Sequence, residues 1–271
     1  MLPETPAPRQ IRGLPEGPVA VPAAVADLAA GAPVEPVWVN ELGGRTFRLG
    51  TSRYVKWAPA DVPGIDLPGE AARLLWARPF TPVPEVLDGG ADEEGTWLVT
   101  AALPGRSAVV PPWVDRPAEA AAAIGAGLRA LHDALPVGES PFDWSVEARL
   151  ATALEHLDAG DTPAAWSPEH RDLTVADARA RLLDPPPLDE LVVCHGDACA
   201  PNTLIGPDGR WAAHVDLGRL GVADRWADLA VAAWSTVWNF GPGYEGHVYA
   251  AYGVAPDHER IAYYRLLWDA T

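Results

Sequence analysis

Residues 191–228 read LVVCHGDACAPNTLIGPDGRWAAHVDLGRLGVADRWAD, and this stretch decides the fold. Its apolar start at 191–193 predicts a short buried strand. Two further apolar runs, 203–205 and 211–215, flank the sequence Gly-Pro-Asp-Gly, and this pattern predicts a β-hairpin. The hairpin fixes the distance between the loop that precedes it and the loop that follows it. We therefore expect the polar side chains of the two loops to converge on one place.

Three oxygen-bearing side chains lie in those two loops. Asp197 and Asn202 precede the hairpin, and Asp216 follows it in Asp-Leu-Gly. The order Asp-x-x-x-x-Asn and then Asp-x-Gly is typical of the catalytic and metal-binding loops of kinases. Asp197 is the predicted base for the attacking hydroxyl, and Asn202 and Asp216 are the predicted Mg²⁺ ligands. A hairpin with scattered polar residues would explain any one of the three, but not the ordered set.

The segments HGDACAPN at 195–202 and DLGRLGVADRWADLA at 216–230 closely resemble the aminoglycoside 3′-phosphotransferase family of antibiotic-resistance kinases. The resemblance continues more weakly over most of the chain. It implies a protein-kinase-like bilobal α+β fold, with a small β-rich lobe and a larger helical lobe. It also implies ATP or GTP with Mg²⁺ as cofactors, and an aminoglycoside hydroxyl, the 3′-hydroxyl, as phosphate acceptor. Arg219 lies where the family has an arginine close to the transferred phosphate and the substrate.

Composition narrows the class of protein. The chain has 271 residues, 48% of them hydrophobic, and can form one bilobal domain or two small ones. No apolar run approaches the roughly 20 residues of a membrane span, and the proline-rich start does not suit a signal peptide, so we expect a cytoplasmic protein. The net charge of −17 argues against nucleic acid and fits a cationic small-molecule substrate. A monomer and a dimer are both compatible with the sequence.

The part of the chain before residue 105 predicts a nucleotide-binding lobe. Residues 1–22 carry six prolines and predict an extended leader. A hairpin over 35–49 turns at Gly43-Gly44, where backbone N–H groups could approach phosphates. An ordinary tight hairpin is the alternative, because a full Gly-x-Gly-x-x-Gly is absent. Further strands predicted at 54–57, 83–87 and 96–100 complete a sheet of five strands.

Lys56 is the single lysine in a chain with nineteen arginines. A compact ammonium group differs from a guanidinium where a point charge must sit between phosphate oxygens, so Lys56 is predicted to bind the α- and β-phosphates. Glu70, on a predicted helix, is its expected partner, as in kinases. Asp61 and Asp66 compete with Glu70 for this role, but they lie in loop-like sequence.

The segment 100–105 is predicted to be a hinge whose backbone hydrogen-bonds the adenine. Ala101 and Leu103 are the nucleotide-binding residues expected there, and Leu-Pro-Gly-Arg resembles the hinge region of the family. We therefore place the leader and the nucleotide-binding lobe in 1–104. The helical catalytic and substrate-binding lobe is placed in 105–271.

Helical periodicity predicts seven further segments: 22–30, 117–135, 146–159, 168–183, 226–238, 244–252 and 257–269. Asp115 is the predicted cap of the second. The fourth begins near His170-Arg171-Asp172-Leu173, which spells the protein-kinase catalytic tetrad. However, the residue five positions after Asp172 is Asp177 rather than Asn, and no Asp-x-Gly follows at hairpin distance. We therefore reject the tetrad as catalytic.

The C-terminal run 264–271 resembles the end of the family, where two adjacent acids and the terminal carboxylate bind the ammonium groups of the drug. Here Trp268 replaces the first acid and Asp269 keeps the second. Asp269 and the Thr271 carboxylate are the predicted substrate ligands. The altered end leaves open a different acceptor, such as another antibiotic, a sugar or an amino alcohol. A catalytically silent nucleotide-binding protein is a third possibility, against which the complete catalytic set argues.

Overall fold

The computed structural model describes residues 13, 15, 17–40, 42–60 and 62–271. Residues 1–12, 14 and 16 of the predicted leader, and Asp61, therefore lie outside the described residues. The described chain forms two compact units, the first of which ends at Leu103, while the second begins at Pro104. Within the described part of the chain, no helix is long and apolar enough to cross a membrane.

The first unit is built on an antiparallel sheet with the strand order β1-β2-β3-β5-β4. The strands are β1 Val34–Val39, β2 Arg45–Leu49, β3 Arg53–Pro59, β4 Val86–Ala91 and β5 Gly95–Ala101. This confirms the predicted five-stranded sheet. The strand predicted at 83–87 instead begins at Val86, because Pro84 has no N–H to donate to a sheet ladder.

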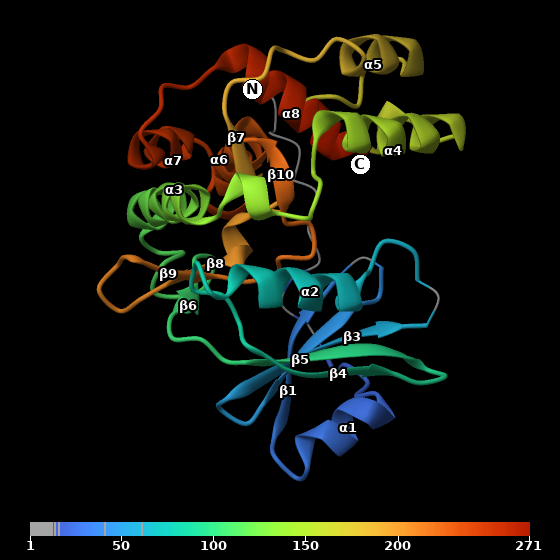
Figure 1. Ribbon diagram of the computed structural model, residues 1–271, viewed down its shortest axis with the longest axis vertical. Helices are drawn as coiled ribbons and strands as arrows, with labels where there is room; N and C mark the ends of the chain where they lie inside the picture. The colour runs from blue at the N-terminus through green and yellow to red at the C-terminus, as the bar shows by residue number, and fades with distance from the viewer. Residues whose placement is uncertain (1–12, 14, 16, 41, 61) are drawn as a thin grey trace, which may run out of the picture. The chain divides into compact units, whose positions relative to one another are not determined.

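Two helices cover this sheet, α1 Ala23–Ala29 and α2 Leu67–Ala77, on opposite faces (Figure 1). On the α1 face, Val25 packs in an apolar core with Phe47 and Val55. Successive side chains of a strand point to opposite faces, so Lys56, which follows Val55, faces α2. The sheet thereby presents the single lysine to the helix that carries Glu70.

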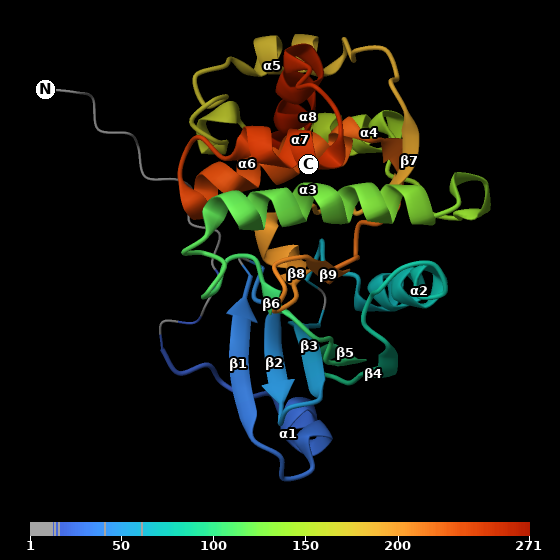
Figure 2. The ribbon, with the colours of Figure 1, turned by 90° about the vertical axis from the view of Figure 1, so that its left-hand side faces the viewer.

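The second unit is mainly helical. Its α-helices are α3 Pro117–Ala134, α4 Val146–Asp158, α5 Val175–Leu182, α6 Trp226–Phe240, α7 Glu245–Tyr252 and α8 His258–Ala270. Short 3₁₀ turns occupy Val137–Glu139, Pro163–Ala165 and Ala200–Asn202. Figure 2 shows α3 running lengthwise along the helices α6 and α7. A Cβ atom added at Gly125 of α3 would lie 2.2 Å from the backbone oxygen of Val248 in α7, so the two helices meet backbone to backbone.

Two predicted helix starts are wrong. The helix expected at 168 begins at Val175, because Thr174 caps it by accepting a hydrogen bond from the Asp177 N–H at 3.0 Å. Asp115 does not cap α3: Arg116 occupies the cap position without a side-chain bond, and Pro117 fills the first helical position.

Five short strands carry the loops of the quoted stretch. They are β6 Arg106–Ser107, β7 Leu191–Cys194, β8 Thr203–Ile205, β9 Trp211–His214 and β10 Gly221–Asp224. The predicted hairpin is β8–β9, with β6 added at its edge, and β7 pairs antiparallel with β10. Asp224 ends β10, and α6 begins two residues later at Trp226. The sequence does not predict β6 and β10 as strands, because β6 has only two residues and the four residues of β10 show neither an apolar run nor a clear alternation.

Candidate active site

Gly196 brings the two loops of the site together. Its φ is +82°, and a Cβ atom there would lie 2.0 Å from the backbone oxygen of Arg219. Glycine alone combines this left-handed conformation with so close an approach. The loop that carries Asp197 therefore rests on the loop that carries Asp216, as the hairpin predicted.

The Asp197 carboxyl group is half-buried, and its Oδ1 has no hydrogen-bond partner in the part of the chain that the structure describes. The Asp197 N–H donates to His195 Nδ1 at 3.2 Å, and His195 Nε2 lies 3.0 Å from the Val215 carbonyl oxygen. These two contacts require the neutral imidazole protonated at Nε2. His195 thus links the backbone of Asp197 to the residue before Asp216.

Asn202 and Asp216 meet at the open end of the hairpin. The Val215 N–H donates to the Asn202 carbonyl at 3.0 Å, and Asn202 Nδ2 donates to the Asp197 carbonyl at 2.9 Å. The second bond orients the amide so that its oxygen remains as the ligand atom. Asp216 has a φ of +65°, a conformation that a non-glycine residue adopts only at a cost and that is concentrated at functional sites. An amide oxygen and a carboxylate on adjoining strand ends fit a hard cation such as Mg²⁺.

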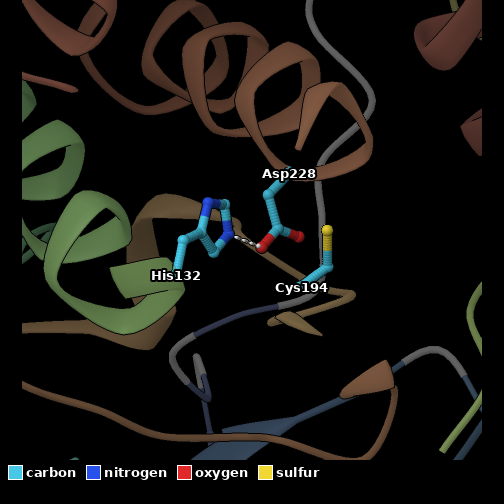
Figure 3. Close-up of side chains that lie close together, drawn as sticks. All are labelled: His132, Cys194 and Asp228. Carbon is cyan, nitrogen blue, oxygen red and sulfur yellow. Dashed lines mark hydrogen bonds and ion pairs between the residues drawn. The ribbon is translucent and has the colours of Figure 1, made fainter. Parts of the chain in front are cut away.

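A buried hydrogen-bond network supports the loop that carries Asp197, and Figure 3 shows one of its contacts, between His132 and Asp228. The Asp228 carboxylate accepts the N–H groups of His195 at 2.6 Å and Gly196 at 2.9 Å, and it lies 3.0 Å from His132 Nε2. His132 Nδ1 lies 2.9 Å from the Tyr252 hydroxyl. Burial by itself would raise the pKa of Asp228, but the hydrogen bonds and the nearby histidines outweigh it, so the pKa is lowered.

His132, Cys194 and Asp228 place possible metal-ligand atoms within 4.8 Å of one another. However, the Cys194 thiol donates to the Asp224 carbonyl oxygen at 3.4 Å, and burial raises its pKa well above the usual value, so it stays protonated. The histidine nitrogens and the carboxylate are already hydrogen-bonded inside the fold. The cluster is therefore a structural support for the loop and not a metal site.

We expect Asp228→Asn to destabilise the protein by about 3–5 kcal/mol, because the amide would turn a donor toward N–H groups in a buried site. Urea unfolding followed by circular dichroism measures this. Asp133→Asn, which changes an exposed carboxylate paired with Arg129, is the control and should unfold at nearly the wild-type midpoint. Equal stability of Asp228→Asn and wild type would contradict the structural role.

Because of His214, we expect the folded protein to lose stability in acid. The ring is buried, and neither ring nitrogen has a hydrogen-bond partner among the described residues. Burial, and then the neighbouring His195, lower the pKa of His214 well below its usual value. Below about pH 6.5, His214 is therefore protonated in the unfolded chain but stays neutral in the folded chain. The free energy of unfolding consequently falls as the pH falls.

We expect this group to contribute up to about 1.4 kcal/mol of lost stability per pH unit below pH 6.5. His214→Leu should flatten the dependence of the unfolding free energy on pH between 6.5 and 5. His258→Leu, at an exposed position on α8, should leave it unchanged. Urea titrations at several pH values measure the free energy of unfolding of each variant. Equal slopes of this free energy against pH for wild type and His214→Leu would refute the role of His214.

Lys56 and Glu70 form the expected ion pair within the first unit. Lys56 Nζ lies 2.7 Å from Glu70 Oε1 and 2.9 Å from Oε2, and the Glu70 side chain is only 6% exposed. Asp66, the competing acid, instead caps α2 by accepting the Gly69 N–H at 2.8 Å. The role of the pair toward phosphates remains a prediction.

At two of the predicted nucleotide-binding positions, the Gly43-Gly44 turn and the hinge, backbone N–H groups already donate hydrogen bonds within the protein. In the Gly43-Gly44 turn, Gly43 N–H donates to the Asn40 carbonyl at 3.2 Å, and Gly44 N–H donates to Asn40 Oδ1 at 2.7 Å. The arrangement is that of an ordinary tight turn closed by an asparagine, and neither glycine N–H is left for a phosphate. At the predicted hinge, Ala101 N–H donates to the Glu85 carbonyl at 2.9 Å. Leu103 ends the first unit and is half-buried.

The predicted substrate residues occupy different settings. Arg219 lies over the rings of Trp144 and Trp268, with its guanidinium carbon 5.6 Å and 5.4 Å from their centroids. The Thr271 hydroxyl accepts a hydrogen bond from Arg149 at 3.2 Å, and its carboxylate stays a predicted ligand.

Asp269 has an internal position in place of the open one that the sequence predicts. Its side chain is 2% exposed and accepts hydrogen bonds from Ser167, at 2.8 Å from the hydroxyl. His170 Nδ1 lies 2.7 Å from its other oxygen. The histidine of the rejected tetrad thus orders the C-terminal helix, while Asp172 is exposed to solvent.

Residues 39–264 match the model of the phosphotransferase enzyme family. An aminoglycoside 3′-phosphotransferase from Streptomyces fradiae is 40% identical over 227 residues, which cover 79% of this chain and 84% of the relative. The crystal structure of an aminoglycoside 3′-phosphotransferase of type VIII is 32% identical, with a TM-score of 0.75 over 92% of this chain and 98% of that one. An aminoglycoside phosphotransferase from Streptomyces rimosus, solved with ADP and streptomycin, is 30% identical, with a TM-score of 0.71 over 92% and 99% of the two chains.

Proposed function

Because this chain belongs to the phosphotransferase enzyme family, we propose that it transfers the γ-phosphoryl group of ATP to the 3′-hydroxyl of an aminoglycoside and thereby confers resistance. The observation that carries the proposal is the convergence of Asp197, Asn202 and Asp216 at the two ends of one hairpin. These are the base and the oxygen ligands that phosphoryl transfer requires. The names of the relatives support the aminoglycoside as acceptor.

In this proposal Asp197 accepts the proton of the acceptor hydroxyl as the hydroxyl oxygen attacks phosphorus. The Asp197 side chain as a whole is half-buried rather than enclosed, so its carboxylate can accept that hydrogen bond. Asn202 and Asp216 would hold Mg²⁺, which when bound neutralises charge on the phosphate oxygens. Lys56, oriented by Glu70, would bind the α- and β-phosphates.

The ion pair between Lys56 and Glu70 has a second use in the proposal. Glu70 is nearly buried, and it accepts two hydrogen bonds from one ammonium group, which fixes the direction of a flexible side chain. A fixed ammonium group loses little conformational entropy when phosphate binds.

We assign the reaction to the cytoplasm, where ATP is available.

The test is ADP release from ATP and Mg²⁺ by the purified protein, measured with kanamycin, neomycin, paromomycin and streptomycin. Sugars and choline serve as control acceptors, and GTP replaces ATP in a parallel series. Turnover with drugs that carry a 3′-hydroxyl, and none with their 3′-deoxy analogues, is the expected result. Turnover with the 3′-deoxy analogues would overturn the assignment of the hydroxyl.

One observation favours a second acceptor class. Asp269 is enclosed by Ser167 and His170, and the preceding residue is Trp268, so this end of α8 offers little negative charge for drug ammonium groups. An acceptor with fewer ammonium groups, such as an amino alcohol or a less basic antibiotic, fits that surface. Turnover with choline or a sugar and silence across the aminoglycosides would select this alternative.

A further inference from the structure

Four side chains from separate segments stack beside the catalytic loop. Arg149 of α4 lies over the ring of Trp144 at 4.8 Å, and Arg219 lies over the same ring at 5.6 Å. Arg219 also lies over the ring of Trp268 in α8, at 5.4 Å. The guanidinium of Arg219 is therefore bounded by two indole rings.

Neither Arg149 nor Arg219 has an acidic partner among the described residues. Within residues 17–40, 42–60 and 62–271, no carboxylate forms an ion pair with Arg149 or Arg219. Burial, and then the charge of Arg219, lower the pKa of Arg149 to about 10. Arg149 is buried and Arg219 is half-buried, so the stack places two positive charges where solvent screens them less than it does at the surface.

Aromatic rings hold an arginine differently from a carboxylate. A carboxylate would engage the N–H edge of the guanidinium and cancel its charge. An indole ring attracts the guanidinium through its face, leaves the net charge in place and leaves the N–H edge available. The two rings thus fix the plane of Arg219 without using its hydrogen-bond donors.

The stack lies next to the loop that carries Asp197. The backbone oxygen of Arg219 would lie 2.0 Å from a Cβ atom at Gly196, the residue before Asp197. Burial raises the pKa of the Cys199 thiol in the loop that carries Asp197, and the positive charge of Arg219 opposes this rise. Trp144 and Trp268 are both half-buried, so neither is needed to fill the core.

We propose that Trp144 and Trp268 are positioning residues that clamp the Arg219 guanidinium in the plane in which it binds the transferred phosphoryl group. The proposal rests on the proposed phosphotransferase function, and it adds two residues to the machinery. The Arg219 charge is expected to interact more strongly with the phosphoryl group in the transition state than in bound ATP. Loss of the clamp should therefore lower kcat more than it changes the KM for ATP.

The test compares Trp268→Leu, which removes the aromatic face, with Trp268→Phe, which keeps one. We expect kcat to fall about 3- to 30-fold in Trp268→Leu, the range of a cation–π contact, with the KM for ATP unchanged and most of kcat retained in Trp268→Phe. In an Arg219→Ala background the same change should have no further effect, because the ring then has no cation to orient. Trp144→Leu and Trp144→Phe should repeat the pattern.

Trp238→Leu is the matched control, since Trp238 is half-buried like Trp268 but packs against the ring of Trp234 at a tilt of 52° and not against Arg219. It should change thermal stability but not kcat. Equal losses in Trp268→Leu and Trp268→Phe, or full losses that persist in the Arg219→Ala background, would overturn the clamp. Trp268→Met takes the place of Trp268→Leu should the latter not fold.

A second readout separates this proposal from the proposed function. Hydrolysis of ATP with water as acceptor needs no drug, and the same set of variants is measured by that reaction. Absence of drug phosphorylation by the wild type would remove the aminoglycoside assignment, while the comparison in ATP hydrolysis would still support or overturn the clamp.

Discussion

Asp197→Asn is expected to lower kcat by about 10²- to 10⁴-fold, the contribution of a positioned general base. Asparagine keeps the size of the side chain and cannot accept a proton at neutral pH. The supports of the loop, which come from His195 and Asp228, act on the backbone and are untouched by the change. Nucleotide affinity should therefore remain close to that of the wild type.

Single-turnover phosphorylation and equilibrium binding of a fluorescent ATP analogue measure the two quantities separately. Asp172→Asn is the matched control, because Asp172 belongs to the His-Arg-Asp sequence that imitates a kinase catalytic loop and is exposed. Its kcat should equal that of the wild type. Surviving turnover in Asp197→Asn, or a loss in Asp172→Asn, would mean that the base has been misassigned.

Asp216→Asn is expected to lower kcat/KM for ATP by about 10²- to 10³-fold, the cost of losing one preorganised group in a charged transition state. Asparagine tolerates the left-handed conformation almost as well as aspartate, so the φ of +65° should be retained. The change then removes negative charge from the predicted metal ligand while it preserves the backbone. We expect the Mg²⁺ concentration needed for half-maximal activity to rise.

A magnesium titration of the initial rate at saturating ATP measures this effect. Asp208→Asn, in the exposed turn of the same hairpin, is the control, since its side chain only accepts the Arg210 N–H at 3.1 Å. Its magnesium dependence should be that of the wild type. An unchanged magnesium dependence in Asp216→Asn would remove Asp216 from the metal ligands.

The sequence predicted the elements whose pattern is local. The hairpin at the site, the five-stranded sheet and the partnership of Lys56 with Glu70 follow from apolar runs, turn residues and a lone lysine. Sequence spacing also distinguished the predicted catalytic loop at 195–202 from the His170-Arg171-Asp172 sequence, whose histidine binds Asp269 in the structure. In each case the signal lay within a few residues or in a well-defined order of functional groups.

Other features depend on tertiary contacts that no local pattern encodes. The enclosure of Asp269 by Ser167 and His170 joins positions about one hundred residues apart. The support of the catalytic loop through His132 likewise spans ninety-six residues to Asp228. The strand β10 is too short to show alternation. The pairing of two tryptophans with Arg219 could be inferred only once α8 and the loop before α4 were placed in space.

The close approach of Gly196 to Arg219 has a consequence for how such an enzyme can acquire new acceptors. The backbone of the loop that carries Asp197, the proposed base, touches the backbone of Arg219 with no room for a side chain, so a substitution at Gly196 would separate the two loops. Asp269 of α8, in contrast, is held through its side chain by Ser167 and His170. We therefore expect substitutions around Asp269 to change acceptor preference while the backbone contact between the two loops of the site stays the same.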